Sequence, residues 1–145
     1  YEPTTEDSYY TRFTVDKNPC NVEILDTGGS ELFQEVRPQW IQNCGGLVFV
    51  YDICEVSSFD LIQQQLCDAQ RLLSNLHRQS PTAPVIPIAL VGNKTDKWAA
   101  RQVLEEEGHL LADEYEAIFL ETSAQYAQGV EELFIRLLRK MRAIR

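Results

Sequence analysis

Two continuous apolar runs constrain the fold of this 145-residue chain more than any other feature. They are GLVFVYD at residues 46–52 and VIPIALVG at residues 85–92, and neither alternates between apolar and polar residues. A strand without alternation has both faces buried, as in a parallel sheet. Residues 57–77, between the runs, carry apolar side chains at helical spacing, with Ser57 or Ser58 as the expected N-cap. The three segments together predict a strand–helix–strand unit.

The segment before these runs predicts a β-hairpin. Residues 8–16 and 20–26 are rich in β-forming residues, and the sequence KNP at residues 17–19 is typical of a turn. After the second run we expect a helix at residues 103–115, a short strand at 117–122 and a closing helix at 129–144. This order predicts one α/β domain over residues 1–145, with an open, mostly parallel sheet and helices on both faces.

Charge and hydropathy exclude some classes of function. Acidic residues exceed basic ones by 22 − 13 = 9, so the surface should repel nucleic acid, and no nucleic-acid partner is expected. No apolar run approaches the roughly 18 residues that a membrane span needs. Five bases crowd the last ten residues: Arg136, Arg139, Lys140, Arg142 and Arg145. They are explained either as the solvated face of a helix end or as the start of a membrane-proximal tail.

Three short polar motifs fall where predicted strands end. They are DTGG at residues 26–29, NKTD at 93–96 and TSA at 122–124. In open α/β sheets, ligands bind at the carboxyl ends of the strands. Taken one at a time, a motif such as NKTD is also explained as a turn that ends a strand. The ordered set of three favours a ligand site, and its chemistry favours a guanine nucleotide.

Each motif has residues that suit one part of such a ligand. The carboxylate of Asp96 matches the two adjacent N–H donors of guanine, a pair that adenine lacks. The methylene stem of Lys94 can lie along a base, and the small Ala124 lets a backbone N–H reach the guanine carbonyl. Asp26 can hold Mg²⁺ through water, and Gly29 lets a backbone N–H approach a terminal phosphate.

With these motifs, the chain resembles the Ras family of small GTPases along its whole length. DTGG, NKTD and ETSA resemble the family's nucleotide-contacting elements, and the opening YEPTTEDSYY resembles switch I and the effector strand. The resemblance implies GTP or GDP and Mg²⁺ as cofactors, with Mg²⁺ held by Thr4 and, through water, by Asp26. It implies a larger set of nucleotide contacts: Tyr1, Thr4, Asp26, Gly29, Asn93, Lys94, Asp96, Ser123, Ala124 and Gln125. It implies effector contacts at Glu6, Asp7, Ser8 and Tyr9.

The sequence also departs from the family pattern. It contains no G-x-x-x-x-G-K-[ST] phosphate loop, so we expect the first strand, that loop and the first helix to be absent from an N-terminally incomplete chain. The chain alone should then bind nucleotide weakly. Ser30 stands where most relatives carry a Gln that orients the attacking water, next to Gly29. This substitution implies slow GTP hydrolysis and leaves enzymatic activity an open question.

Two functions follow from the resemblance. The first is a GTP/GDP-dependent molecular switch in signal transduction, with effector proteins that carry Ras-binding domains, an exchange factor and a GTPase-activating protein as partners. The second is a pseudo-GTPase that presents the effector strand without nucleotide chemistry. The expected location is the cytoplasm or, in a full-length protein with a lipidated tail that this chain lacks, the inner face of the plasma membrane.

Overall fold

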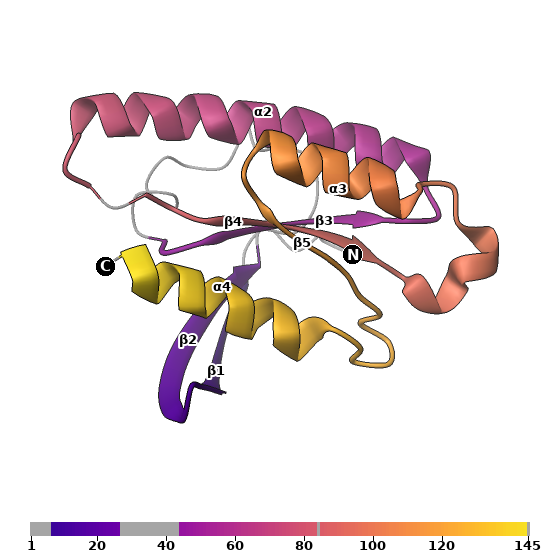
Figure 1. Ribbon diagram of the computed structural model, residues 1–145, viewed down its shortest axis with the longest axis horizontal. Helices are drawn as coiled ribbons and strands as arrows, with labels where there is room; N and C mark the ends of the chain where they lie inside the picture. The colour runs from indigo at the N-terminus through magenta and orange to yellow at the C-terminus, as the bar shows by residue number, and fades with distance from the viewer. Residues whose placement is uncertain (1–6, 27–43, 84, 145) are drawn as a thin grey trace.

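The computed structural model describes residues 7–26, 44–83 and 85–144 (Figure 1). Several residues that the sequence assigns to the nucleotide or effector site lie outside these ranges: Tyr1, Thr4, Glu6, Gly29 and Ser30. The described residues form an α/β arrangement, as predicted. None of the described helices is both long and apolar enough to cross a bilayer.

A three-stranded parallel sheet forms the centre of the structure. Its strands are β3 (Leu47–Asp52), β4 (Ile88–Asn93) and β5 (Ile118–Glu121), and they lie in the order β3-β4-β5. Val48 faces Ala89 across the first pair, and Leu90 faces Phe119 across the second. The two apolar runs therefore form parallel strands of one sheet, as the sequence predicts, and the structure shows that they are neighbours.

Helices cover both faces of this sheet (Figure 1). One face packs under α2 (Val56–Gln79) and α3 (Glu105–Glu114), and the other packs against α4 (Val130–Ile144). The first core contains, among others, Phe49, Tyr51, Phe59, Leu66, Leu90, Leu111 and Phe119. The second contains Ala89, Val91, Ile118, Leu133 and Leu137. Burial of these side chains, at about 1.5–3 kcal/mol for each large one, holds the layers together.

Strand β3 departs from the expectation that both faces of the apolar runs are buried. All but the last residue of β4 are buried, whereas Val48 and Val50 of β3 are 37% and 51% exposed. The reason is the placement of α4, which contacts β4 and β5 on that face. In the described part of the chain, β3 is also the end strand of its sheet. It therefore buries only the face that carries Phe49 and Tyr51.

Tyr51 is packed tightly between two glycines. A Cβ atom on Gly92 would lie 2.8 Å from the Tyr51 hydroxyl, and one on Gly108 would lie 2.5 Å from it and 2.4 Å from the Phe119 ring. Gly108 thus permits close packing between α3 (Glu105–Glu114) and the sheet. The Tyr51 hydroxyl is buried with no hydrogen-bond partner among the described residues, and burial raises its pKa.

The hairpin consists of β1 (Asp7–Val15) and β2 (Asn18–Asp26), which pair antiparallel as predicted. The predicted position of the turn was wrong. The turn residues are Asp16 and Lys17, with φ angles of 50° and 69°, and residues 18 and 19 already belong to β2. Positive φ at both central residues is the signature of a type I′ turn, whose twist matches the flanking strands. The Asn18 side chain supports it by donating to the Asp16 carbonyl at 3.3 Å.

The hairpin packs against α4. The rings of Phe13 and Phe134 stack with their centroids 5.2 Å apart, and Val15 is fully buried. Arg139 donates to both carboxylate oxygens of Asp16, and Arg142 donates to the Val15 carbonyl at 3.2 Å. Two of the bases near the C-terminus therefore contact the hairpin.

The ends of the helices differ slightly from the predicted ones. Helix α2 begins at Val56 and has Glu55 at its N-cap, without a side-chain cap bond, so the prediction of Ser57 or Ser58 as the cap was wrong. The Ser58 hydroxyl instead accepts the backbone N–H of Asp52 at 2.9 Å. A short 3₁₀ helix, η1 (Thr95–Ala100), follows β4 and was not predicted.

Candidate functional site

Two loops lie side by side at the carboxyl end of the parallel sheet (Figure 1), and residues of both line a pocket. One leads from β4 into η1, and the other connects β5 to α4. The pocket has a volume of about 160 Å³. Its lining residues are Asn93, Lys94, Asp96, Lys97, Ala124 and Gln125. Since drug-sized ligands occupy about 300–1,000 Å³, this pocket suits one part of a ligand, such as a base.

Asn93 joins the two loops. Its side-chain oxygen accepts the Thr122 hydroxyl at 3.1 Å and the backbone N–H of Ala124 at 3.0 Å. In addition, the backbone N–H of Thr95 donates to the Thr122 carbonyl at 3.1 Å. The last residue of β4 thus fixes the loop that follows β5.

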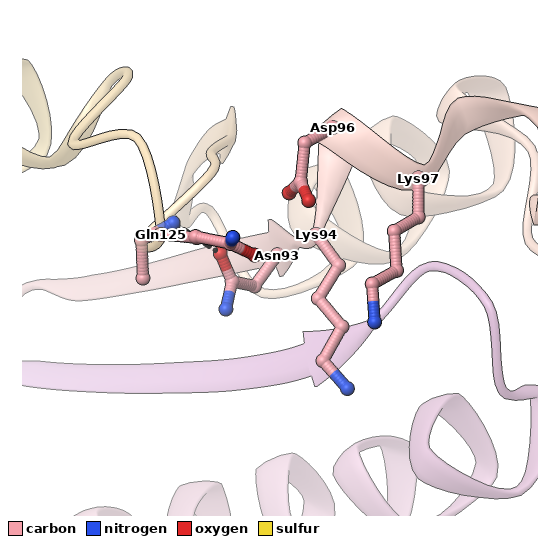
Figure 2. Close-up of a pocket in the computed structure, with 6 residues that line it drawn as sticks. Asn93, Lys94, Asp96, Lys97 and Gln125 are labelled. Atoms are coloured by element: carbon pink, nitrogen blue, oxygen red, sulfur yellow. Dashed lines mark hydrogen bonds between the residues drawn. The ribbon is translucent and has the colours of Figure 1, made fainter.

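The Asp96 carboxylate is held by a buried serine. The Ser123 hydroxyl donates to Asp96 Oδ1 at 2.8 Å, and Ser123 itself is fully buried. Ser123 is fixed in turn because its backbone exchanges two hydrogen bonds with Gln128, at 3.0 and 2.9 Å. In Figure 2 the Asp96 carboxylate points toward the loop that carries Gln125. Within the described ranges, Asp96 Oδ2 accepts no hydrogen bond, so this oxygen is available to a ligand.

Lys94 stands at the junction of β4 and η1. Its backbone is in the left-handed region, at φ 72° and ψ 35°, and its Nζ lies 2.8 Å from Asp52 Oδ2 at the end of β3. The hydrogen bond to Asp52 raises the pKa of the Lys94 amine. Desolvation acts to raise the pKa of Asp52, but the bonds from Lys94 and the Cys54 N–H hold it below its ordinary value. Both groups are therefore charged at neutral pH.

A second ion pair joins the segment after η1 to the end of β5. Arg101, just after η1, donates to both oxygens of Glu121 at 2.7 and 2.6 Å, and also to the Val103 carbonyl at 2.9 Å. The side chains of Arg101 and Glu121 are 23% and 11% exposed. Bidentate geometry and partial burial make this a stronger tie than an ordinary surface pair. It holds the segment that carries Asp96 against the end of β5.

The structure brings together most of the residues predicted to contact the base. Asn93, Lys94, Asp96, Ala124 and Gln125 line the pocket, and Ser123 lies beneath Asp96. The backbone N–H of Ala124 was predicted to reach the guanine carbonyl, but here it donates to Asn93. A base that accepts a hydrogen bond from this N–H would have to share the N–H with the Asn93 side chain or take the place of that side chain.

The other predicted site residues within the described ranges lie on the hairpin. Asp26 is exposed at the end of β2 and does not line the pocket. It faces Asp7 across the hairpin, and Ser8 and Tyr9 follow on β1, where both are exposed. Asp26 offers one exposed carboxylate, which is the kind of ligand that Mg²⁺ takes from proteins alongside phosphates and water. No cluster of three or more metal-binding side chains occurs among the described residues.

Sequence reasoning missed Lys97 and Asp52. Lys97 lines the pocket one residue beyond the NKTD motif, and nothing in its spacing distinguishes it from a solvated lysine. Asp52 ends the run GLVFVYD, so it lies at the carboxyl end of a parallel strand like the other motifs. That position was a usable signal.

A parallel sheet covered on both faces, with a polar pocket where its strands end, defines this protein as an α/β domain of the nucleotide-binding type. The sequence matches the Ras family over residues 1–143, and the chain belongs to that family. It is similar to Ras-like protein 1 of Pyricularia oryzae, with 39% identity over 155 residues. It shares 39% identity with protein ras-2 of Neurospora crassa and 36% with GTP-binding protein Rit1 of the mouse.

The alignments cover 98% of this chain but a smaller part of each relative. That part is 64% of the Pyricularia protein, 67% of the Neurospora protein and 61% of mouse Rit1. The chain thus spans less than two thirds of the Pyricularia and mouse proteins.

Proposed function

We propose that this chain is the base-reading part of a guanine-nucleotide-dependent switch in signal transduction. The observation that carries the proposal is the Asp96 carboxylate, which the buried Ser123 hydroxyl holds at 2.8 Å at the edge of the pocket. Membership of the Ras family and the resemblance to a protein named as GTP-binding support the choice of ligand.

The discrimination between bases follows from the fixed carboxylate. Guanine presents two adjacent N–H donors that one carboxylate accepts together, whereas adenine presents an acceptor in place of one of them. A bound adenine would leave the carboxylate desolvated and incompletely paired, which costs about 1–3 kcal/mol or more. Because Ser123 prevents Asp96 from turning away, the pocket cannot adapt to the wrong base.

A second group of residues is proposed to contact the phosphates of the nucleotide and Mg²⁺. Thr4, Asp26 and Gly29 are proposed to meet them, and Asp26 is the only one of the three within the described ranges. When bound, Mg²⁺ would neutralise phosphate charge, with the carboxylate of Asp26 holding it through water. GTP hydrolysis is proposed to be slow because Ser30, next to Gly29, has a side chain too short to orient water directly.

The proposed partners act on the hairpin. Effector proteins would bind residues Glu6 to Tyr9 in the GTP-bound state, and an exchange factor and a GTPase-activating protein would set the balance between the GTP-bound and GDP-bound states. The proposed location is the cytoplasm, with the inner face of the plasma membrane for a lipidated full-length form.

The alternative function is a pseudo-GTPase that presents the same strand constantly. The observation that favours it is the exposure of β1, where the side chains of Tyr9 and Tyr10 are 53% and 77% exposed.

Titration of the chain with GDP and with ADP separates the two functions. Amide signals of Ala124 and Gln125, followed by NMR, should move with GDP and not with ADP. Binding should be weak, because base contacts alone leave the phosphate charges uncompensated. A sub-micromolar Kd would contradict the expected weakness, and equal responses to GDP and ADP would contradict the proposed function.

A further inference from the structure

The carboxylate of Asp52 connects the end of β3 to the pocket. Its Oδ2 lies 2.8 Å from the Nζ of Lys94, and its Oδ1 accepts the backbone N–H of Cys54 at 2.8 Å. The Asp52 side chain is 14% exposed and that of Lys94 is 45% exposed. Asp52 is therefore the more fixed partner, and the pair determines where the longer and more mobile Lys94 side chain lies.

The turn that carries Asp52 is itself anchored on both sides. The backbone N–H of Asp52 donates to the Ser58 hydroxyl at 2.9 Å, which links the turn to the first turn of α2. The N–H of Ile53 donates to the Asn93 carbonyl at 3.1 Å, and the Ile53 carbonyl accepts the N–H of Val103 at 3.0 Å. The position of Asp52 is thus set by β4 and by the segment after η1, independently of Lys94.

Within the described ranges, the ion pair with Asp52 is the one polar contact of the Lys94 side chain. The figure shows Lys94 extending away from Asp96, in the same direction as Lys97 (Figure 2). A lysine side chain loses considerable rotamer freedom when it is held in one position. The Asp52 carboxylate supplies the fixed charge that offsets this loss, and it also neutralises the ammonium group.

We propose that Asp52 is a positioning residue for ligand binding, which holds the methylene stem of Lys94 in the pocket wall while occupying its ammonium group. The stem then offers an apolar surface to the flat face of a base, and the charge is not free to pair with a phosphate. The inference rests on the proposed function, because it concerns how the pocket receives guanine. The inference adds Asp52, which is outside the NKTD motif and does not line the pocket, to the residues proposed to act in ligand binding.

The first test measures Lys94 directly and needs no ligand. Lysine reactivity toward trace acetic anhydride is followed over a pH series by mass spectrometry, in the wild type and in Asp52→Asn. The pKa of the Lys94 amine should fall in the variant, because its carboxylate partner is lost. An unchanged Lys94 titration would overturn the inference.

The second test measures binding of GDP by NMR titration. Asp52→Asn should weaken GDP binding about threefold to fivefold, the scale expected for loss of a half-exposed ion pair. Lys94→Met keeps an apolar stem but no charge, so adding Asp52→Asn to it should have no further effect on the Kd. Asp60→Asn, which removes an exposed carboxylate on α2, is the matched control and should change neither measurement.

The outcomes separate this inference from the proposed function. Failure of the wild type to bind GDP would overturn the proposed function, and the ligand role of Asp52 with it. Equal GDP affinities of wild type and Asp52→Asn would overturn the inference alone. A second result would also overturn the inference alone: Asp52→Asn binds inorganic pyrophosphate more tightly than the wild type does and binds GDP no more weakly. Lys94 would then act by pairing with phosphate and not by packing on the base.

Discussion

The pocket and the hairpin are built in different ways. In the pocket, side chains from one loop bond directly to those of the next, as Asn93 does to Ala124 and Ser123 to Asp96. The hairpin reaches the rest of the described structure mainly through α4, by the Phe13–Phe134 stack and an exposed ion pair. The pocket is therefore fixed by contacts between several segments, whereas the hairpin is fixed mainly by its contacts with α4.

This difference fits the two tasks that we propose for these regions. A site that reads a base needs donors and acceptors fixed before the ligand arrives, because each freely moving group would have to be ordered on binding. A strand that meets a protein partner needs exposed side chains and an accessible edge, and β1 provides both. We therefore expect substitutions in the core beneath the pocket to affect the whole domain, and substitutions in the hairpin to act locally.

The largest effect should come from Gly108→Ala. The new Cβ would lie 2.4 Å from the ring of Phe119 and 2.5 Å from the hydroxyl of Tyr51, both of them buried. Because both rings are packed in the first core, we expect the free energy of unfolding to fall by about 3 kcal/mol in urea denaturation. Glu106→Ala, at an exposed position on the same helix, should change it by no more than about 0.5 kcal/mol. Similar stabilities for the two variants would show that the core rearranges around Gly108 to accommodate the added methyl group.

Next in size is the effect of Asp96→Ala on base selectivity. Loss of a charge-assisted pair with guanine should weaken GDP binding about 10- to 100-fold and leave ADP binding unchanged, so that the preference for guanine disappears. NMR titration with the two nucleotides measures it. Asp113→Ala, which removes an exposed carboxylate from α3, should keep the preference. If Asp96→Ala still prefers GDP, another residue reads the base.

Sequence alone could predict the parallel sheet, its helices and the hairpin, because unbroken apolar runs and helical spacing leave few other arrangements. It could also place Asn93, Lys94, Asp96 and Ala124 at one edge, because parallel strands bring their carboxyl ends together. The turn at Asp16 and Lys17 could not be read in the same way. Its positive φ angles are usual for Gly or Asn, and the sequence has neither at those two positions.

The parts of the site that the sequence could not supply depend on contacts between distant segments. The bond between Arg101 and Glu121 joins residues 20 positions apart. The pairing of Lys94 with Asp52 requires knowledge of which strand lies beside β4. Likewise, the hydrogen bond from the Ala124 N–H to the Asn93 side chain depends on the path of a loop. The spacing of apolar residues in the sequence does not predict that path.

A hairpin substitution, Phe13→Ala, should have a smaller and more local effect. It removes the stack on Phe134 and part of the apolar surface between β1 and α4. Because Phe13 is only half-buried, we expect a loss of about 2 kcal/mol in the free energy of unfolding, less than a fully buried Phe costs. Amide shifts should change in β1, β2 and α4 but not at Asn93 or Ser123. Tyr10→Ala, at a site that is 77% exposed, is the control. Shifts that spread to the pocket would contradict the separation of the two regions.

The smallest effect concerns the ion pair between Asp16 and Arg139, whose side chains are 57% and 53% exposed. The hydrogen bond from Arg139 holds the pKa of Asp16 below its ordinary value, against the opposing effect of desolvation. An acid with a lowered pKa in the folded state stabilises the fold above its ordinary pKa of about 3.9, and this contribution is lost as the pH falls through the lowered value. Asp16→Asn should therefore lower the melting temperature slightly at pH 7.

At a pH below the lowered pKa of Asp16, the wild type and Asp16→Asn should melt at the same temperature, because the wild-type carboxyl is then protonated too. High salt at pH 7 should also narrow the difference, since the pair is exposed to solvent. Arg139→Gln should reproduce the pH dependence of Asp16→Asn, and combining the two substitutions should add little to either. A difference in melting temperature that is the same at neutral and acidic pH would mean that Asp16 acts through the geometry of its turn and not through its charge. The link between the hairpin and α4 would then rest on the Phe13–Phe134 stack.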